Sequence, residues 1–262
     1  MTHIDDGSVH DLIDELALRP AHRGDLPEVA ELYIATRRAS SPQMPAAALG
    51  DEEIRDWFAG TRLVADGGTK EIWLAETGGP SDGEILGFAV LDAGWLDSLY
   101  VGPQHQARGI GSALLDLVKS VRPEGFALWV FASNASARGF YHRHGLLELE
   151  HTDGTANDER SPDVRMAWPG KEPIRFLRSQ IDEVDDELAL LLARRFALTA
   201  TVQGFKERGG QQGRDPVRER AIADRMAAHA PGLGAAAIAR IMDAVISESL
   251  DAYDSRPPHR DR

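Results

Sequence analysis

Two sets of residues have types and a spacing that could support chemistry. The first is the stretch 106–111 (Gln-Ala-Arg-Gly-Ile-Gly), which follows an apolar run and precedes a helical pattern. Backbone N–H groups at a helix start have no intrahelical partner, and glycines allow close approach, so this turn could hold a pyrophosphate. On its own it could equally be an ordinary strand-to-helix turn. The second set is Arg195 and Lys206, three helical turns apart and therefore on one side of a helix.

Arg195 interrupts an apolar heptad seam. The other seam positions are Ile174, Leu177, Ile181, Val184, Leu188, Leu191, Leu198, Val202 and Phe205. A buried arginine needs an anionic partner, so the pattern favours an anion site over a solvated seam with a stray arginine. The predicted helix has about 36 residues and is about 54 Å long. A small module cannot cover that length alone, which predicts a homodimer. Arg178 lies about 100° around the helix from Arg195 and is expected to serve the neighbour's site.

Different elements must position the two sets. Short apolar runs at 71–75, 85–91, 96–101 and 126–131 predict strands, and residues 25–40 and 111–121 have helical spacing. After Pro173 only helical patterns remain, with a second helix from Asp215-Pro216 and a third over about 235–253. We therefore expect two domains, 16–169 and 173–254, with flexible ends at 1–15 and 255–262.

Composition narrows the possible functions. The 262 residues carry a formal net charge of −13, and all of the excess precedes Lys171, because 15 basic and 15 acidic residues follow from there. An acidic protein is a poor candidate for binding nucleic acid or an anionic membrane. No cysteine is present, which excludes disulfides, cysteine-ligated metals and a cysteine nucleophile. Neither a signal peptide nor a membrane span is apparent, so we expect a cytoplasmic protein.

The first domain resembles the GNAT N-acetyltransferases. Residues 106–111 match their Gln/Arg-x-x-Gly-x-Gly/Ala signature, residues 97–103 match their fourth strand, and residues 128–134 match their fifth strand with its terminal asparagine. Residues 137–145 match the following helix. The resemblance implies an α+β fold, in which helices flank a mixed sheet, and acetyl-CoA as co-substrate. The residues it implies for acetyl-CoA are Leu99, Val101, Gln106, Ala107, Arg108, Gly109, Gly111, Ser112 and Asn134.

In such an enzyme an amine attacks the thioester directly, so no acyl-enzyme is needed. The resemblance makes Tyr141 the acid that protonates the departing thiolate, although it could also be a packed tyrosine. Asn134 could likewise be only a strand-end cap. Glu76, Asp97 and His142 are undifferentiated candidates for a general base, and water alone suffices in some members. The segment 39–54 is expected to form the acceptor wall, and the acidic charge favours a cationic amine. His142 and His144 face different directions on a helix, so no metal site is expected.

The second domain resembles the all-helical, AroQ-type chorismate mutases. The motifs are 177–188, Arg195, Lys206 and the string 214–220 (Arg-Asp-Pro-Val-Arg-Glu-Arg). The resemblance implies an all-α, three-helix, intertwined dimeric domain that binds a chorismate-like dicarboxylate. The substrate-binding residues it implies are Arg178 from the partner, Arg195, Lys206, Asp215, Arg218, Glu219 and Ser249. The catalytic residues it implies are Arg195, Lys206, Glu219 and Tyr253. Asp215 could also be only a helix cap.

Tyr253 is a departure, because the family usually has Gln or Glu there, against the substrate's ether oxygen. A phenol can donate a hydrogen bond, but it is longer and aimed differently. Three interpretations follow. The domain rearranges chorismate to prephenate, acts on 4-amino-4-deoxychorismate or isochorismate instead, or is a weakly active dimerising or sensor module that controls the acetyltransferase.

Overall fold

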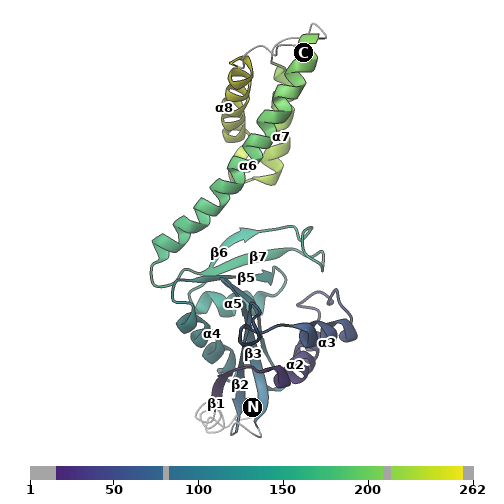
Figure 1. Cartoon of the computed structure of the whole chain (residues 1–262), viewed down its shortest axis with the longest axis vertical. Helices are drawn as coiled ribbons and strands as arrows, with labels where there is room; N and C mark the ends of the chain where they lie inside the picture. The colour runs from purple at the N-terminus through teal and green to yellow at the C-terminus, as the bar shows by residue number, and fades with distance from the viewer. Residues whose placement is uncertain (1–15, 79–82, 209–213, 256–262) are drawn as a thin grey trace, which may run out of the picture. The chain divides into compact units, whose positions relative to one another are not determined.

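The structure is a computed structural model that describes residues 16–78, 83–208 and 214–255 (Figure 1). The chain divides into two units between Arg178 and Ser179, and each is described by itself. Flexible ends were predicted at 1–15 and 255–262, and all of these residues except Ser255 lie outside the described residues.

Seven strands of the first unit form one mixed sheet in the order β1-β2-β3-β4-β5-β7-β6 (Figure 1). The strands are β1 (Leu16–Pro20), β2 (Lys70–Thr77), β3 (Glu84–Asp92), β4 (Trp95–Val101), β5 (Phe126–Phe131), β6 (Leu147–His151) and β7 (Asp163–Trp168). The α-helices are α2 (Leu26–Ala39), α3 (Asp51–Gly60), α4 (Ile110–Val121) and α5 (Ala135–Arg143). Three short 3-10 turns are η1 (Arg23–Asp25), η2 (Val64–Asp66) and η3 (Pro103–His105).

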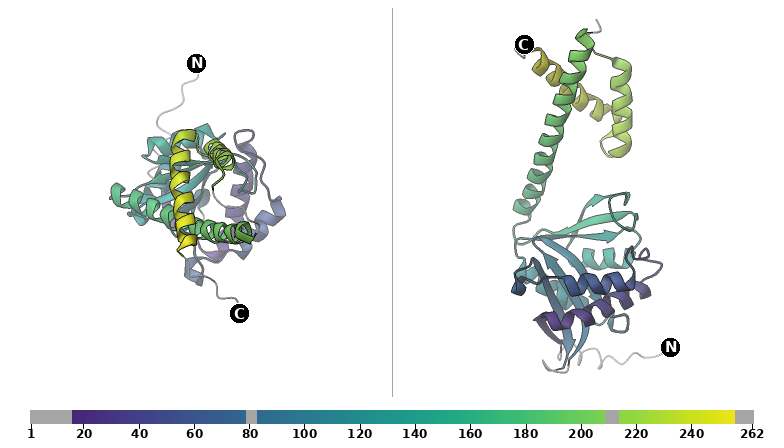
Figure 2. Two further views of the ribbon diagram at one scale, coloured as in Figure 1. Left: turned by 90° about the horizontal axis from the view of Figure 1, so that it is seen from above. Right: turned by 45° about the vertical axis from the view of Figure 1, so that its right-hand side comes forward.

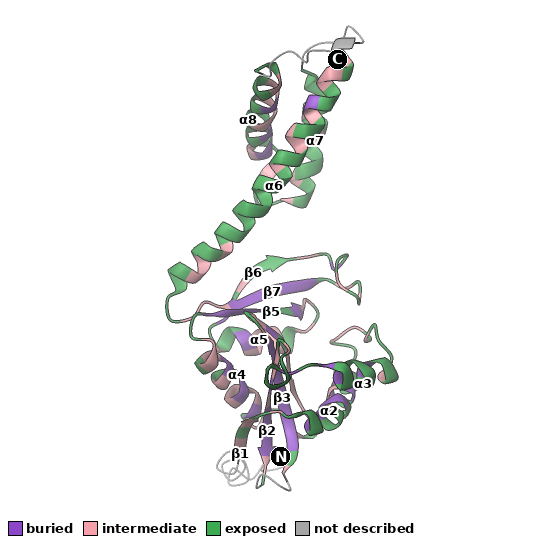
Figure 3. Ribbon diagram, viewed as in Figure 1, coloured by how far each residue is buried: buried purple, intermediate pink, exposed green. Residues whose placement is uncertain are grey.

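Helices cover both faces of this sheet, and each face has its own core. On one face α2 and α3 pack over Ile72, Leu74 and Phe88. On the other, residues of α4 and α5 such as Leu114 and Tyr141 pack over the opposite side chains of the strands. Figure 3 shows the strands as mostly buried and the outer helix faces as exposed. Because alternate strand residues point to opposite faces, the central strands β2 and β3 supply buried side chains to both cores.

The strands β4 and β5 separate almost at once. They are paired in parallel only at Trp95 and Ala127. Further along β4, a bulge opposite Val90 and Leu91 of β3 leaves Asp97 without a register partner. Bulges bend a strand and raise its twist, so the rest of β4 diverges from β5. The divergence leaves one edge of β4 around Leu99 open beside β5.

The strands and helices predicted for this unit are all present, with ends shifted by one or two residues. Four elements were not predicted from the sequence, namely β1, α3, β6 and β7. Physical reasons explain two of the three missed strands. β6 is an edge strand whose residues are mostly exposed, and β7 has an arginine within its run, so neither shows a clear apolar pattern.

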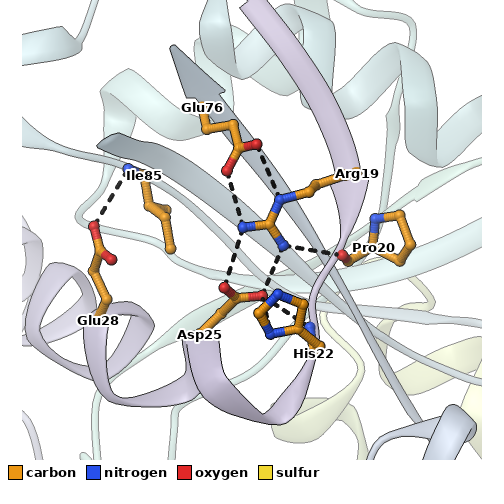
Figure 4. Close-up of polar contacts among 7 residues, drawn as sticks. All are labelled: Arg19, Pro20, His22, Asp25, Glu28, Glu76 and Ile85. Atoms are coloured by element: carbon orange, nitrogen blue, oxygen red, sulfur yellow. Dashed lines mark hydrogen bonds and ion pairs between the residues drawn. The ribbon is translucent and has the colours of Figure 1, made fainter. Parts of the chain in front are cut away.

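A buried ionic cluster ties β1 to the start of α2 (Figure 4). The Arg19 guanidinium donates to Glu76 Oε1 at 3.0 Å and to Asp25 at 2.7 and 3.1 Å. The N–H of His22 also donates to Asp25, at 2.8 Å. Glu76 is thus occupied as a structural partner of Arg19, and it does not line the cavity described below. This removes Glu76 from the general-base candidates.

The second unit contains helices throughout its described part. Helix α6 (Pro173–Arg208) is continuous across the unit boundary, and α7 (Pro216–His229) and α8 (Gly234–Asp254) follow (Figure 2). All three predicted helices are therefore confirmed within one or two residues. The buried apolar cluster is small and joins Ala223 of α7 to Ile238 and Met242 of α8.

The heptad seam of α6 is exposed in the single chain (Figure 3). Val184 is 58% exposed, Leu191 61% and Phe205 67%. The segment Pro173–Lys206 also has the length and composition of a membrane span, with a mean hydropathy of 1.2 in its most apolar stretch. One helix therefore meets the criteria of length and composition, which by themselves do not show that it crosses a membrane. The apolar residues recur every three or four positions, which is the spacing of a helix that packs on other helices.

Candidate functional site

A cavity of about 470 Å³ opens where β4 and β5 diverge. Its walls come from both faces of the sheet. Leu99 of β4, Asn134 and Tyr141 contribute from the side of α5, and Tyr33 and Arg37 contribute from α2. The loop between β6 and β7 adds Thr152, Ala156, Asn157 and Glu159, and the first residue of β7 adds Asp163. Of the segment 39–54, predicted as the acceptor wall, Met44 lines the cavity.

The turn before α4 presents unused backbone donors. Ala107 and Gly109 have positive φ values of 60° and 86°. Such a conformation is unusual for alanine, and successive residues of opposite hand turn their N–H groups to one side. Among the described residues, no acceptor is recorded for the N–H groups of Gln106, Ala107, Arg108 or Gly109. The first N–H groups of α4, including those of Gly111 and Ser112, are also without intrahelical partners. The geometry fits an anionic group such as a pyrophosphate.

The other residues expected at this turn are engaged within the fold. The Gln106 side chain donates to the Val101 carbonyl at 3.2 Å, and Val101 does not line the cavity. The Ser112 hydroxyl lies 3.0 Å from Nε2 of His144. Asn134 caps α5, because its Oδ1 accepts the Ala137 N–H at 3.1 Å. The amide nitrogen of Asn134 is the part of that side chain suited to donate to a ligand.

Tyr141 lies at the inner wall and is 8% exposed. A tyrosine phenol is protonated at neutral pH even at its ordinary pKa, and burial raises the pKa of Tyr141 further. A protonated phenol at a cavity wall can act as a proton donor. Of the three base candidates only Asp97 lines the cavity, and its carboxylate contacts the Lys70 ammonium. His142 instead pairs with Glu148 at 3.0 Å, outside the cavity.

A second cavity, of about 570 Å³, lies among the three helices of the second unit. Five cationic side chains line it, against two anionic ones. The cations are Arg195, Lys206, Arg214, Arg218 and Arg225, and the anions are Asp215 and Glu219. Apolar residues such as Leu191, Val202 and Ile246 form the rest of the wall. The predicted set from α6 and α7 is thus brought together in an excess of positive charge.

Three predicted residues do not line this cavity in the single chain. Arg178 is exposed on α6, and Tyr253 and Ser249 come from α8. Ser249 is 2% exposed and accepts a hydrogen bond from Arg195 Nη1 at 2.9 Å. It therefore positions the Arg195 side chain without itself lining the cavity. The Tyr253 hydroxyl lies beside Gly204, 3.7 Å from where a Cβ on that glycine would be.

Asp215 has the capping role that the sequence left open. Its Oδ1 accepts the N–H groups of Val217 at 3.1 Å and Arg218 at 3.0 Å, which fixes the start of α7 at the cavity wall. Glu219 is held by Arg214, whose guanidinium donates to both carboxylate oxygens at 2.8 and 2.6 Å. Neither Arg214 nor Arg225 was predicted from the sequence to be a site residue. Arg214 directly precedes the capping residue Asp215, and this position could have indicated that it lies at the cavity.

Two family models match this chain, one at residues that belong to the first unit and one mainly within the second. Residues 68–145 match the family model "Acetyltransferase (GNAT) domain", and residues 177–252 match "Chorismate mutase type II". The peptidyl-lysine N-acetyltransferase YiaC of Escherichia coli is 29% identical over 157 residues, which are 58% of this chain and 96% of that protein. A probable N-acetyltransferase of Mycobacterium tuberculosis is 28% identical over 151 residues, covering 53% of this chain and 82% of that protein.

Among solved structures, the PaiA N-acetyltransferase of Thermoplasma acidophilum in complex with coenzyme A is similar. It is 19% identical with a TM-score of 0.44, and the match covers 59% of this chain and 98% of that one. Within the described residues, no group of three or more His, Asp or Glu side chains could hold a metal ion.

Proposed function

We propose that this chain, which joins a GNAT acetyltransferase domain to a type II chorismate mutase domain, catalyses two reactions in two separate cavities. The first is transfer of an acetyl group from acetyl-CoA to an amine. The second is the rearrangement of chorismate to prephenate. We propose domain bounds of 16–169 and 173–254 and a cytoplasmic location.

The acetyl-transfer proposal rests mainly on the cavity at the divergence of β4 and β5 and on the free N–H donors of the turn that follows β4 in the chain. The backbone of residues 106–112 would hold the pyrophosphate, and the exposed backbone of Leu99 and the N–H of Val101 would hold the pantetheine and acetyl groups. The amine nitrogen attacks the thioester carbon, a C–N bond forms and the C–S bond breaks. Tyr141 gives its proton to the departing thiolate, the newly bonded nitrogen releases one proton to water, and the phenolate regains a proton from water.

The test is release of CoA thiol from acetyl-CoA against a panel of primary amines, with the acetylated product identified by mass. Binding of acetyl-CoA is measured separately by calorimetry. Binding together with turnover of at least one amine is expected. A chain that does not bind acetyl-CoA would refute this half of the proposal.

The chorismate proposal rests mainly on the five cations that line the second cavity. Chorismate is a dicarboxylate, and its rearrangement breaks an ether C–O bond while a C–C bond forms, without a covalent enzyme intermediate. Arg195 and Lys206 would bind a carboxylate and stabilise the charge on the ether oxygen. Arg218 would bind the second carboxylate, and the carboxylates of Asp215 and Glu219 would contact the ring hydroxyl.

We further propose that this domain forms a homodimer in which Arg178 of the partner subunit completes each site. The exposed seam of α6 supports this, because an apolar stripe of that length is normally covered. Mixing Arg178→Ala and Arg195→Ala chains is the direct test. Either variant alone is expected to be inactive, and the mixture should regain about a quarter of the wild-type activity per dimer. No regain would refute the shared site.

Tyr253 supports a second candidate function for this domain. The hydroxyl beside Gly204 is not on the cavity wall, so the usual donor to the ether oxygen is lacking in this geometry. A domain without this donor would act on 4-amino-4-deoxychorismate or isochorismate. Alternatively, it would only bind such ligands and thereby control the acetyltransferase. Incubation with all three compounds separates these functions. Turnover of chorismate alone supports the first proposal, and binding without turnover supports the sensor.

A further inference from the structure

The acceptor half of the first cavity can be located from the strand register. Phe131 of β5 pairs with Asp163 of β7, so both side chains point to the same face of the sheet. The Arg37 guanidinium of α2 lies 5.6 Å from the centre of the Phe131 ring. The carboxylate of Asp163 is therefore on the α2 side of the sheet, across the β4–β5 divergence from Tyr141.

Charges in this half of the cavity are unevenly compensated. Arg37 donates to Glu159 at 2.9 Å, so these two opposite charges form a pair. Burial opposes the charge on Arg37, but Tyr100, Tyr33 and Glu159 raise its pKa on balance. Asp97 contacts Lys70. Of the charged residues that line the cavity, Asp163 is the one that these two ion pairs do not include.

Asp163 is 9% exposed and accepts hydrogen bonds from Asn157 Nδ2 at 2.9 Å and from the Thr152 hydroxyl. Both donors are neutral. Among the described residues, no Lys, Arg or His lies within ion-pair distance of its carboxylate. A buried carboxylate without a cation is unfavourable unless a ligand supplies one.

Aromatic side chains line the same half of the cavity. Tyr33 and Tyr100 are in edge-to-face contact with ring centres 5.0 Å apart, and Trp129 and Phe131 lie along β5. Aromatic faces favour flat apolar groups and nearby cations. The combination is suited to a ligand that carries a positive charge on a ring-sized apolar body.

We infer that Asp163 docks the ammonium group of the acetyl acceptor, and that the acceptor is a primary amine with an aromatic or similarly flat apolar body. The inference rests on the proposed acetyltransferase function. Asp163 binds and orients the amine, and the Arg37–Glu159 pair keeps Arg37 from repelling it. Thr152 and Asn157 hold the Asp163 carboxylate at the cavity wall.

Calorimetry on the full chain saturated with CoA tests this with three probes that share one body. The probes are 2-phenylethylamine, 2-phenylethanol and 3-phenylpropanoate, which at neutral pH are cationic, neutral and anionic. The wild type should bind the amine about tenfold more tightly than the alcohol, and the carboxylate most weakly. Asp163→Asn keeps the size and the acceptor oxygen, and it should abolish the preference for the amine over the alcohol.

Asp116→Asn is the matched control, because Asp116 is an exposed carboxylate on α4 and does not line the cavity. It should bind all three probes as the wild type does. Equal amine affinity in Asp163→Asn and wild type would overturn the inference. So would tightest binding of the carboxylate, or no binding of the amine by the wild type. Unchanged CoA affinity and melting temperature in Asp163→Asn separate a local effect from misfolding. Failure of the wild type to bind CoA would instead refute the proposed function.

Discussion

The two cavities of this chain have opposite electrostatic character and unequal structural support. The cavity at the β4–β5 divergence has the carboxylates of Asp97, Glu159 and Asp163 against one guanidinium, and it lies between two extensive cores. The helical cavity has five cations against two anions, and the buried cluster beside it is small. The net charge of −13 describes neither site. The first unit can organise its site from its own core, whereas the second leaves the apolar seam of α6 exposed in the single chain.

The largest expected effect follows from that difference in support. Val184→Asp places a charge on the exposed seam, away from the residues that line the helical cavity. If the proposed dimer forms through this seam, we expect Val184→Asp to dissociate it and to abolish chorismate turnover, with acetyl transfer retained. Sedimentation equilibrium and the two activity assays measure this. Leu190→Asp is the control, since Leu190 is equally apolar, 73% exposed and off the seam. Dissociation of both variants would show that the seam has no special role.

The next effect concerns only the acetyltransferase site. Tyr141→Phe removes the phenol that is the proposed proton donor, and it preserves the buried ring. We expect kcat for acetyl transfer to fall about 10²-fold, at the lower end of general-acid effects, with little change in the KM for acetyl-CoA. Chorismate turnover should not change. Wild-type kcat in this variant would exclude Tyr141 as the acid.

A smaller effect is expected on the stability of the first unit. Burial opposes ionisation of Asp25, but hydrogen bonds from Arg19 and the His22 N–H lower its pKa on balance. A carboxylate whose pKa is lower in the folded state stabilises the fold above its unfolded pKa, about 4, and this stabilisation is lost as the pH falls. Asp25→Asn should cost about 2 kcal/mol at pH 7 and less below pH 4. Urea unfolding at several pH values measures it, and a pH-independent difference would contradict the assignment.

The smallest effect belongs to the helical unit. Asp215→Ala removes the cap of α7 and should destabilise that unit by about 1 kcal/mol. Asp215→Asn retains the capping oxygen and should restore the stability. If chorismate turnover falls in the alanine variant and recovers with asparagine, capping is the main role of Asp215. Loss in both would indicate that its charge contacts the substrate.

The sequence was sufficient to predict an element where its formation depends only on residues that are neighbours in the chain. The helical spacing after Pro173 and the Asp-Pro start at 215–216 predicted α6 and α7, because periodicity and capping are properties of neighbouring residues. The strand pair β6 and β7 was missed, because edge exposure and an internal arginine obscure the alternation. Without β7, Asp163 could not be recognised, since its position beside Phe131 depends on strand pairing between residues 32 positions apart.

The sequence by itself therefore determined the two domain types, the turn at 106–111 and the row of cations on α6, because each is encoded within a few helical turns or one short motif. Only the tertiary structure decided which charged side chains have a partner of opposite charge and which do not. It paired Glu76 with Arg19 and Arg37 with Glu159, placed Ser249 behind Arg195, and left Asp163 without a cation among the described residues. Compensation of a charge depends on distances between side chains remote in sequence, and those distances are set by packing.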